Sequence, residues 1–162
     1  MKFLTFCLLF FRVLIPLNVV HAAQDQDLSK AVIVGNGPKV IIEFTDPDCS
    51  FCRKASAYFN NRSDIKRYIF FYPLPHHPYS VSKIRHILSQ DDKSRIYHNV
   101  MNGSLDRKIK YEFNSKGVGL QKEHLNISNV HKIKATPTFL ISGEIIEGFD
   151  LTRIEELIGV KQ

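Results

Sequence analysis

The clearest pattern in the chain is a set of short apolar runs whose composition is typical of β-strands. Residues 31–34 and 40–44 are short runs rich in β-branched and aromatic residues, and a turn at residues 35–38 separates them. Residues 65–72 form a third run of this kind, which is closed by Pro73. These runs predict three strands in the first half of the chain.

The segment between the second and third runs has the period of a helix. Asp46-Pro47-Asp48 ends the preceding strand, and a helix begins near Cys49 with Cys52, Ala55 and Phe59 on one face. A strand, a helix and a strand in this order favour a βαβ unit with a parallel sheet.

A helical block follows the third strand, from residue 80 to about residue 133. Two amphipathic helices are recognisable within it. Their apolar faces contain Val81, Ile84, Ile87 and Leu88 in the first helix, and Ile96, Val100 and Met101 in the second. Asn102-Gly103 is expected to end the second helix.

The chain returns to strands after this block. Residues 138–141 and 144–149 flank a tight turn at Ser142-Gly143, which predicts a hairpin. Residues 152–155 have the sequence of a capping box that opens a last helix, and Gly159 is expected to end it.

The composition is that of one globular α/β domain. The chain has 162 residues, of which 44% are hydrophobic and 23% are charged, so it can bury a core and is not disordered. The formal net charge is +6, but the Lys and Arg residues are scattered and no aromatic residues interleave with them. We therefore expect no nucleic-acid partner.

Residues 1–22 have the features of a secretory signal peptide. Lys2 precedes an apolar stretch that continues to Val20, and a small residue follows at Ala22. An arginine and a proline interrupt the stretch, which argues against a membrane-spanning helix. The sequence predicts cleavage after Ala22 and an exported domain of residues 23–162, with a retained membrane anchor as the alternative.

Two of the three cysteines lie in the predicted domain, spaced C-x-x-C. Cys49 at a helix N-terminus faces unpaired backbone N–H groups, which favour its thiolate, and Cys52 lies one turn further on the apolar face. We expect Cys49 to be the nucleophile and Cys52 the resolving thiol. A structural disulfide would constrain little chain at this spacing, and a zinc site would need two further ligands.

The surroundings of the pair leave its redox potential open. Asp48 should oppose the Cys49 thiolate, whereas Arg53 and Lys54 should support it. The loop at residues 76–78 contains two histidines and is expected to be solvated, with a position at the rim of the active site as the alternative. The histidine spacings do not indicate a metal, and we expect no cofactor.

Residues 44–54, together with Ala135-Thr136-Pro137, resemble the catalytic domain of the periplasmic disulfide isomerases of the DsbC/DsbG type. The similarity extends from about Val40 to Ile158. It implies an α/β thioredoxin fold with a helical insertion, at about residues 76–133, between the βαβ unit and the C-terminal hairpin and helix.

The resemblance also implies roles for three further residues. Pro137 corresponds to a cis-proline that faces the active site, where neighbouring backbone can pair with an extended substrate peptide. The hydroxyl of Thr136 could contact Cys49 or substrate. Glu43 has the spacing of a buried acid that exchanges protons with Cys52, and the alternative is a strand-end glutamate that reaches solvent.

The function implied by the resemblance is thiol:disulfide exchange with exported, cysteine-containing protein substrates in the periplasm, with a membrane thiol reductase as electron donor. We expect a monomer, because the predicted domain leaves no room for the dimerisation domain of these isomerases. A reducing or isomerising role is favoured over an oxidising one. The alternatives are a DsbA-like oxidase and a non-catalytic peptide- or copper-binding module, although copper carriers of this fold usually have C-x-x-x-C.

Overall fold

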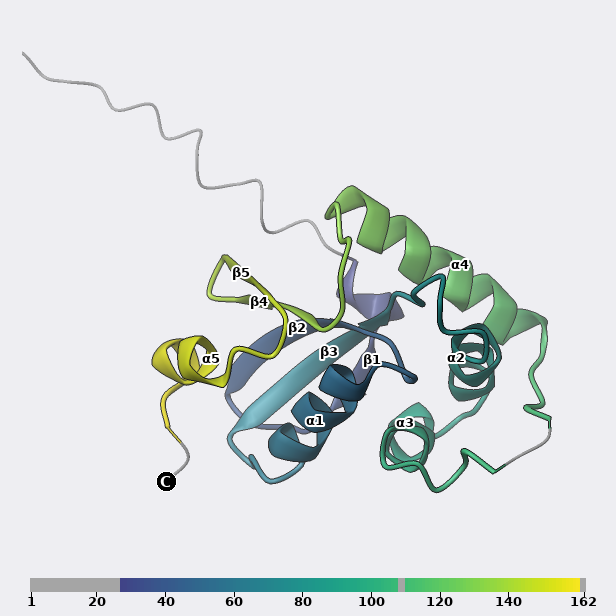
Figure 1. Ribbon diagram of the computed structural model, residues 1–162, viewed down its shortest axis with the longest axis horizontal. Coiled ribbons are helices and arrows are strands. Elements are labelled where there is room, and N and C mark those ends of the chain that lie inside the picture. The colour runs from purple at the N-terminus through teal and green to yellow at the C-terminus, as the bar shows by residue number, and fades with distance from the viewer. Residues whose placement is uncertain (1–26, 108–109, 161–162) are drawn as a thin grey trace, which may run out of the picture.

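A five-stranded mixed sheet forms the centre of the computed structural model, which describes residues 27–107 and 110–160. The strand order is β1-β3-β2-β4-β5 (Figure 1). The strands are β1 (Val32–Val34), β2 (Lys39–Thr45), β3 (Ile65–Phe71), β4 (Thr138–Ile141) and β5 (Glu144–Glu147). Only β2 and β3 pair in parallel among these strands, which confirms the predicted βαβ unit.

Within the described residues, five α-helices and a short 3₁₀ helix, η2 (Leu28–Lys30), surround the sheet. The α-helices are α1 (Ser50–Phe59), α2 (Ser80–Leu88), α3 (Lys93–Met101), α4 (Ser115–Val130) and α5 (Leu151–Ile158). Helices α2, α3 and α4 lie between β3 and β4 in the chain, where the helical insertion was predicted. Together with the strand order, this arrangement confirms the expected thioredoxin fold.

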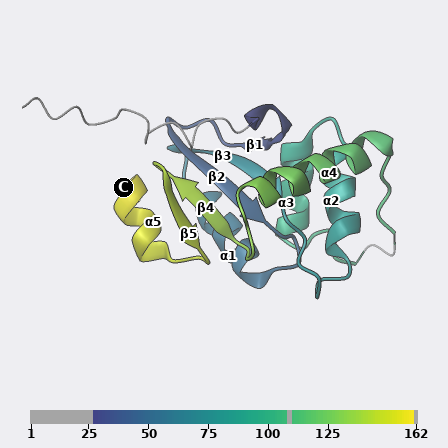
Figure 2. The same cartoon turned by 90° about the horizontal axis from the view of Figure 1, so that it is seen from above.

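Different helices cover the two faces of the sheet. Helices α1 and α5 pack on one face through a cluster that includes Ala55, Phe59 and Ile154, while α4 and η2 cover the other face beside Phe44 and Phe70. Figure 2 shows α4 and α1 on opposite sides of the strands. Because α1 begins at the end of the central strand β2, its N-terminus lies at an edge of the core.

The last helix begins one residue before the predicted capping box. Its N-cap is Asp150, whose carboxylate accepts a hydrogen bond from the Arg153 N–H at 3.1 Å, so the prediction that Thr152 caps the helix is wrong. Asp is among the preferred N-cap residues, and here it competes successfully with a threonine two positions later. The predicted end at Gly159 is confirmed, with a φ of 79°.

The predicted signal peptide lies outside the described residues, so its cleavage stays a prediction. Within residues 27–107 and 110–160, none of the helices is long and apolar enough to cross a membrane.

His124 ties α4 to the sheet and to η2. Its ring is fully buried, Nδ1 accepts a hydrogen bond from the Phe71 N–H at 3.0 Å, and Nε2 lies 2.8 Å from the carbonyl oxygen of Lys30. Nε2 must therefore carry the proton of a neutral ring. Burial lowers the pKa of His124 to about 4.

Acidification is expected to destabilise the protein through this residue. The unfolded chain binds a proton at His124 below about pH 6.5, whereas the folded chain does so only near pH 4, so stability is complete above this window and decreases within it. The loss amounts to about 3 kcal/mol. Urea unfolding at several pH values should show this loss in the wild type and a flatter pH dependence in His124→Gln. An equal slope in both proteins would contradict the assignment.

Candidate active site

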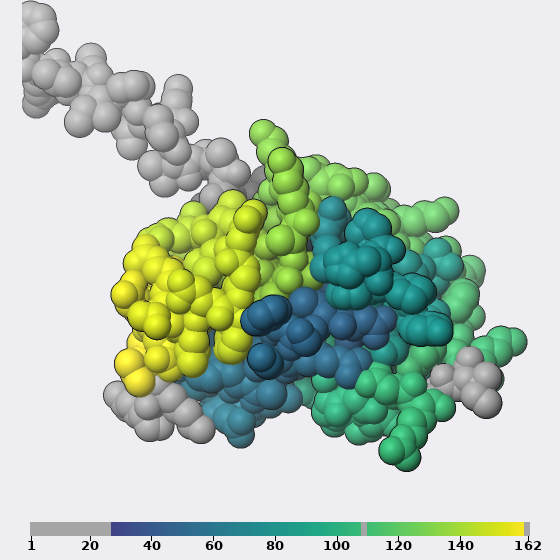
Figure 3. Space-filling model, in the orientation of Figure 1, coloured from purple at the N-terminus to yellow at the C-terminus, as the bar shows by residue number. Residues whose placement is uncertain are grey.

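The turn after β2 places Cys49 at the N-terminus of α1. Cys49 is the N-cap residue, and its N–H donates to the carbonyl oxygen of Asp46 at 3.1 Å. Figure 3 shows the dark blue surface of this segment between the teal segment after β3 and the yellow-green C-terminal part of the chain. Three parts of the chain thus meet around this segment, within which Cys49 is only 7% exposed and Cys52 is 0% exposed.

The Cys49 thiol is prepared to ionise. Its pKa is lowered to about 5, chiefly by a hydrogen bond from the Cys52 thiol and further by the backbone N–H groups of Cys52 and Phe51, against the opposing effect of partial burial. These donors are the unpaired groups that the helix N-terminus predicts. At neutral pH, Cys49 is therefore a thiolate.

Cys52 has the opposite character. It is fully buried, and burial raises the pKa of its thiol, as does its hydrogen bond to Cys49. The N–H of Asp46 donates to its sulfur at 3.4 Å. Both thiols are free. One group is thus poised as a thiolate near the surface and the other as a protonated thiol beneath it.

Alkylation kinetics can test whether the pKa of the Cys49 thiol is lowered. The rate of reaction with iodoacetamide should rise with a midpoint near pH 5 and be constant at pH 7, whereas an ordinary cysteine has its midpoint near pH 8.5. In Cys52→Ala the midpoint should move upward, because the strongest hydrogen bond to the thiolate is lost. A wild-type midpoint above about pH 8 would refute the shift.

Thr136 and Pro137 lie against Cys49, as the sequence predicts. The peptide bond between them is cis, and the Cys49 sulfur lies 3.4 Å from the Thr136 carbonyl oxygen, to which it donates a hydrogen bond when it is protonated. The N–H of Gly148 donates to the Pro137 carbonyl at 2.7 Å, which anchors this segment to the end of β5. The Thr136 hydroxyl has no partner in good hydrogen-bond geometry among the described residues, but it lies close enough to Cys49 to help lower the pKa of that thiol.

Glu43 is fully buried, which excludes a side chain that reaches solvent. Its Oε2 accepts a hydrogen bond from Arg67 of β3 at 2.9 Å, and Arg67 is itself only 1% exposed. The same guanidinium lies 3.3 Å from the Tyr97 hydroxyl and from the Asn60 side chain. The sequence indicated neither Arg67 nor Tyr97; the one available signal was an arginine, preceded by Lys66, within a mostly apolar strand.

Two cationic side chains form ion pairs with the acidic residues beside the two cysteines. Lys83 of α2 donates to Asp48 and to Asp106 at 2.6 Å each, and Arg53 binds the Asp106 carboxylate through two nitrogens at 2.5 and 2.8 Å. Arg53 therefore holds Asp106, and Lys83 offsets the charge that Asp48 places next to Cys49. Lys54, the other predicted support, is exposed and lies over the Phe51 ring.

Asp46 is the main residue of the site that sequence analysis missed. It is fully buried, and its carboxylate accepts hydrogen bonds from the Asp48 N–H at 2.8 Å, the Leu74 N–H at 2.7 Å and the Ser80 hydroxyl. His77 Nδ1 lies 2.8 Å from the same carboxylate. The expectation of a solvated loop at residues 76–78 is therefore wrong for His77, because a buried acid attracts its ring.

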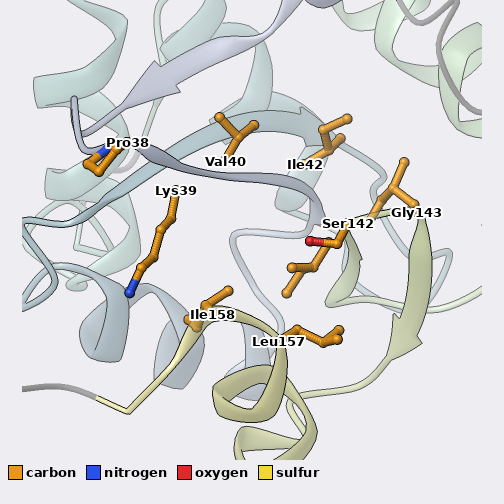
Figure 4. Close-up of a pocket in the computed structure, with 10 residues that line it drawn as sticks. Pro38, Lys39, Val40, Ile42, Ser142, Gly143, Leu157 and Ile158 are labelled. Atoms are coloured by element: carbon orange, nitrogen blue, oxygen red, sulfur yellow. The ribbon is translucent and has the colours of Figure 1, made fainter.

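A hollow of about 600 Å³ lies elsewhere on the molecule (Figure 4). It is lined by Val40, Ile42, Leu157 and their neighbours, between the start of β2, the β4–β5 turn and the end of α5. It contains none of the predicted site residues. Within the described residues, no group of three or more His, Cys, Asp or Glu side chains is placed to hold a metal ion.

Comparison with known proteins places this site in context. A family model described as a thioredoxin-like domain matches residues 26–150. The probable thiol:disulfide interchange protein DsbC of Bordetella pertussis is 29% identical over 75 residues, which are 46% of this chain and 26% of that protein. The matched part thus spans about a quarter of the length of this curated relative.

Solved structures agree on the fold. A disulfide interchange protein from Neisseria gonorrhoeae is 26% identical, with 81% of this chain and 94% of that chain covered and a TM-score of 0.66. The catalytic domain of Proteus mirabilis ScsC is 20% identical, with 85% and 92% covered and a TM-score of 0.61, which shows the fold alone. Proteins named for disulfide interchange are oxidoreductases.

Proposed function

Because the chain belongs to the family of thioredoxin-like domains, we propose that it is a thiol:disulfide oxidoreductase that acts on protein substrates through Cys49 and Cys52. The observation that carries the proposal is the contrast between the two thiols: the pKa of Cys49 is lowered and that of buried Cys52 is raised, at a distance that lets them share a hydrogen bond. Disulfide exchange needs one thiolate to attack and one nearby thiol to resolve.

In the reducing direction, the Cys49 thiolate attacks one sulfur of a substrate disulfide. The substrate S–S bond breaks, its second sulfur leaves as a thiolate, and a mixed disulfide with Cys49 forms. Cys52 then loses its proton and attacks the Cys49 sulfur, which forms the Cys49–Cys52 disulfide and releases the second substrate thiolate. Two electrons pass from the pair to the substrate, and oxidation is the reverse sequence.

Three predicted site residues have roles in this proposal. The backbone at Thr136 and Pro137 would pair with an extended segment of the substrate, and its position supports this role, since the Thr136 carbonyl oxygen lies 3.4 Å from the Cys49 sulfur. Glu43 would exchange the Cys52 proton. Its burial supports this role, whereas its carboxylate is already engaged in an ion pair with Arg67.

The setting of the reaction is also a proposal. We place the protein in the periplasm as a monomer that receives electrons from a membrane thiol reductase. The signal-like segment at residues 1–22 supports export, and the names of the similar proteins support a role in disulfide interchange. Substrates would be exported proteins that contain cysteines.

The favoured direction is reduction or isomerisation, because Ser50-Phe51 between the cysteines resembles the dipeptide of the isomerases. One observation favours oxidation as a second candidate: a low pKa at Cys49 makes it a good leaving group and stabilises the reduced form.

Equilibration with glutathione buffers, which measures the reduction potential of the Cys49–Cys52 pair, decides between these directions. A reduction potential below about −200 mV would indicate a reductase, one near −180 mV an isomerase and one near −120 mV an oxidase. A pair that does not equilibrate would refute the proposed function.

A further inference from the structure

The backbone of Asp46 contacts both active-site cysteines. Its N–H donates to the Cys52 sulfur at 3.4 Å, and its carbonyl accepts from the Cys49 N–H at 3.1 Å. The position of Asp46 therefore determines whether its N–H can donate a hydrogen bond to the buried Cys52 sulfur. Whatever fixes Asp46 also fixes the surroundings of Cys52.

Residues 74–80, from the loop after β3 to the first residue of α2, hold Asp46 through its carboxylate. Three of their groups contact this carboxylate: the Leu74 N–H at 2.7 Å, His77 Nδ1 at 2.8 Å and the Ser80 hydroxyl, which also lies 3.1 Å from the Asp48 carboxylate. His77 donates to this carboxylate in the tautomer that carries a proton on Nδ1. The side chain of His77 is 19% exposed, whereas that of Asp46 is completely buried.

We propose that His77 and Ser80 are positioning residues for the resolving step, because they hold the Asp46 carboxylate and thereby the N–H that bonds the Cys52 sulfur. The inference rests on the proposed exchange activity. It assigns a role in the reaction to a segment outside the C-x-x-C helix and the 136–137 backbone.

The reason lies in the charge that develops on Cys52. When Cys52 attacks the mixed disulfide, its sulfur passes through an anionic state in a fully buried position, which is unfavourable without nearby donors. A donor held in place offsets that cost without reorganising during the reaction. The first step does not need this donor, because the attacking sulfur is already the thiolate of Cys49.

The two steps can be measured separately with oxidised glutathione as the probe. The reduced protein is mixed with the probe, quenched with acid at intervals and analysed by mass spectrometry. Formation of the Cys49–glutathione adduct reports the first step. Its conversion to the Cys49–Cys52 disulfide, with release of a second glutathione thiolate, reports the resolving step.

In His77→Ala and in Ser80→Ala, the resolving step should slow about tenfold, as expected for one lost hydrogen bond to a charged group, while the first step changes less than about twofold. His77→Asn should restore most of the rate, because its side-chain amide can donate near the position of Nδ1. His76→Ala is the matched control: the exposed His76 ring packs against that of His77, with centroids 4.2 Å apart, but it is not among the groups that bond the Asp46 carboxylate, so both steps should change less than about twofold.

Several results would overturn the inference. One is a resolving step that is as fast in His77→Ala and Ser80→Ala as in His76→Ala. Another is an equal slowing of both steps, which would indicate a general loosening of the site. A wild-type protein that forms no adduct with oxidised glutathione would instead refute the proposed exchange activity, and the inference with it.

Discussion

Replacing Cys49 with alanine is expected to reduce disulfide exchange by roughly 10³-fold or more, because the residue supplies the thiolate on which every step depends. Cys52→Ala should behave differently. Its Cys49 can still attack a substrate disulfide, but the intramolecular attack that ends the mixed disulfide is lost. Covalent complexes with substrate should therefore accumulate in this variant alone.

Non-reducing electrophoresis with a disulfide-containing protein substrate separates these outcomes. A band of combined mass should appear with Cys52→Ala and disappear after reduction, while Cys49→Ala should give none. Both variants should unfold near the wild-type denaturant concentration, which controls for misfolding. Similar residual exchange in the two variants would refute the assignment of nucleophile and resolving thiol.

Much of the fold could be predicted from the sequence because its elements are strongly periodic. The run of residues 40–44 has no polar residue besides Glu43, and the structure places it in the central strand β2. The face formed by Cys52, Ala55 and Phe59 is buried in α1. The C-x-x-C spacing and Thr136-Pro137 then identified the two segments that meet at the candidate site, although they are far apart in the chain.

Side-chain partners across the fold could not be predicted in the same way. Lys83 binds Asp48 and His77 binds Asp46 across the packing of α2 against the end of β2, and no local pattern encodes which cation meets which acid. Arg67 also appeared to be an ordinary polar position on a strand. Its pairing with Glu43 depends on the parallel register that sets Glu43 opposite Ile69, two residues further along β3.

The ion pair between Glu43 and Arg67 determines how a change at Glu43 affects stability. An isolated buried carboxylate would be costly, so removing the charge of Glu43 would stabilise the fold. In the structure, Glu43 and Arg67 are 0% and 1% exposed, and a 2.9 Å hydrogen bond joins them. Removing the carboxylate charge would leave the guanidinium buried without its counter-ion, which is the more expensive situation.

Glu43→Gln is therefore expected to lower the free energy of unfolding by about 3–5 kcal/mol, the cost of breaking a buried ion pair from one side. Urea unfolding at pH 7 measures the change. The matched control is Glu144→Gln, which neutralises the acid of an exposed pair with Arg153 and should change stability by no more than about 0.5–1 kcal/mol.

The double variant Glu43→Leu/Arg67→Met, which removes both charges, should recover most of the loss. If Glu43→Gln were as mild as the surface control, the buried pair would contribute little. If the double variant were no more stable than Glu43→Gln, the loss would come from packing around Glu43 rather than from an unpaired arginine.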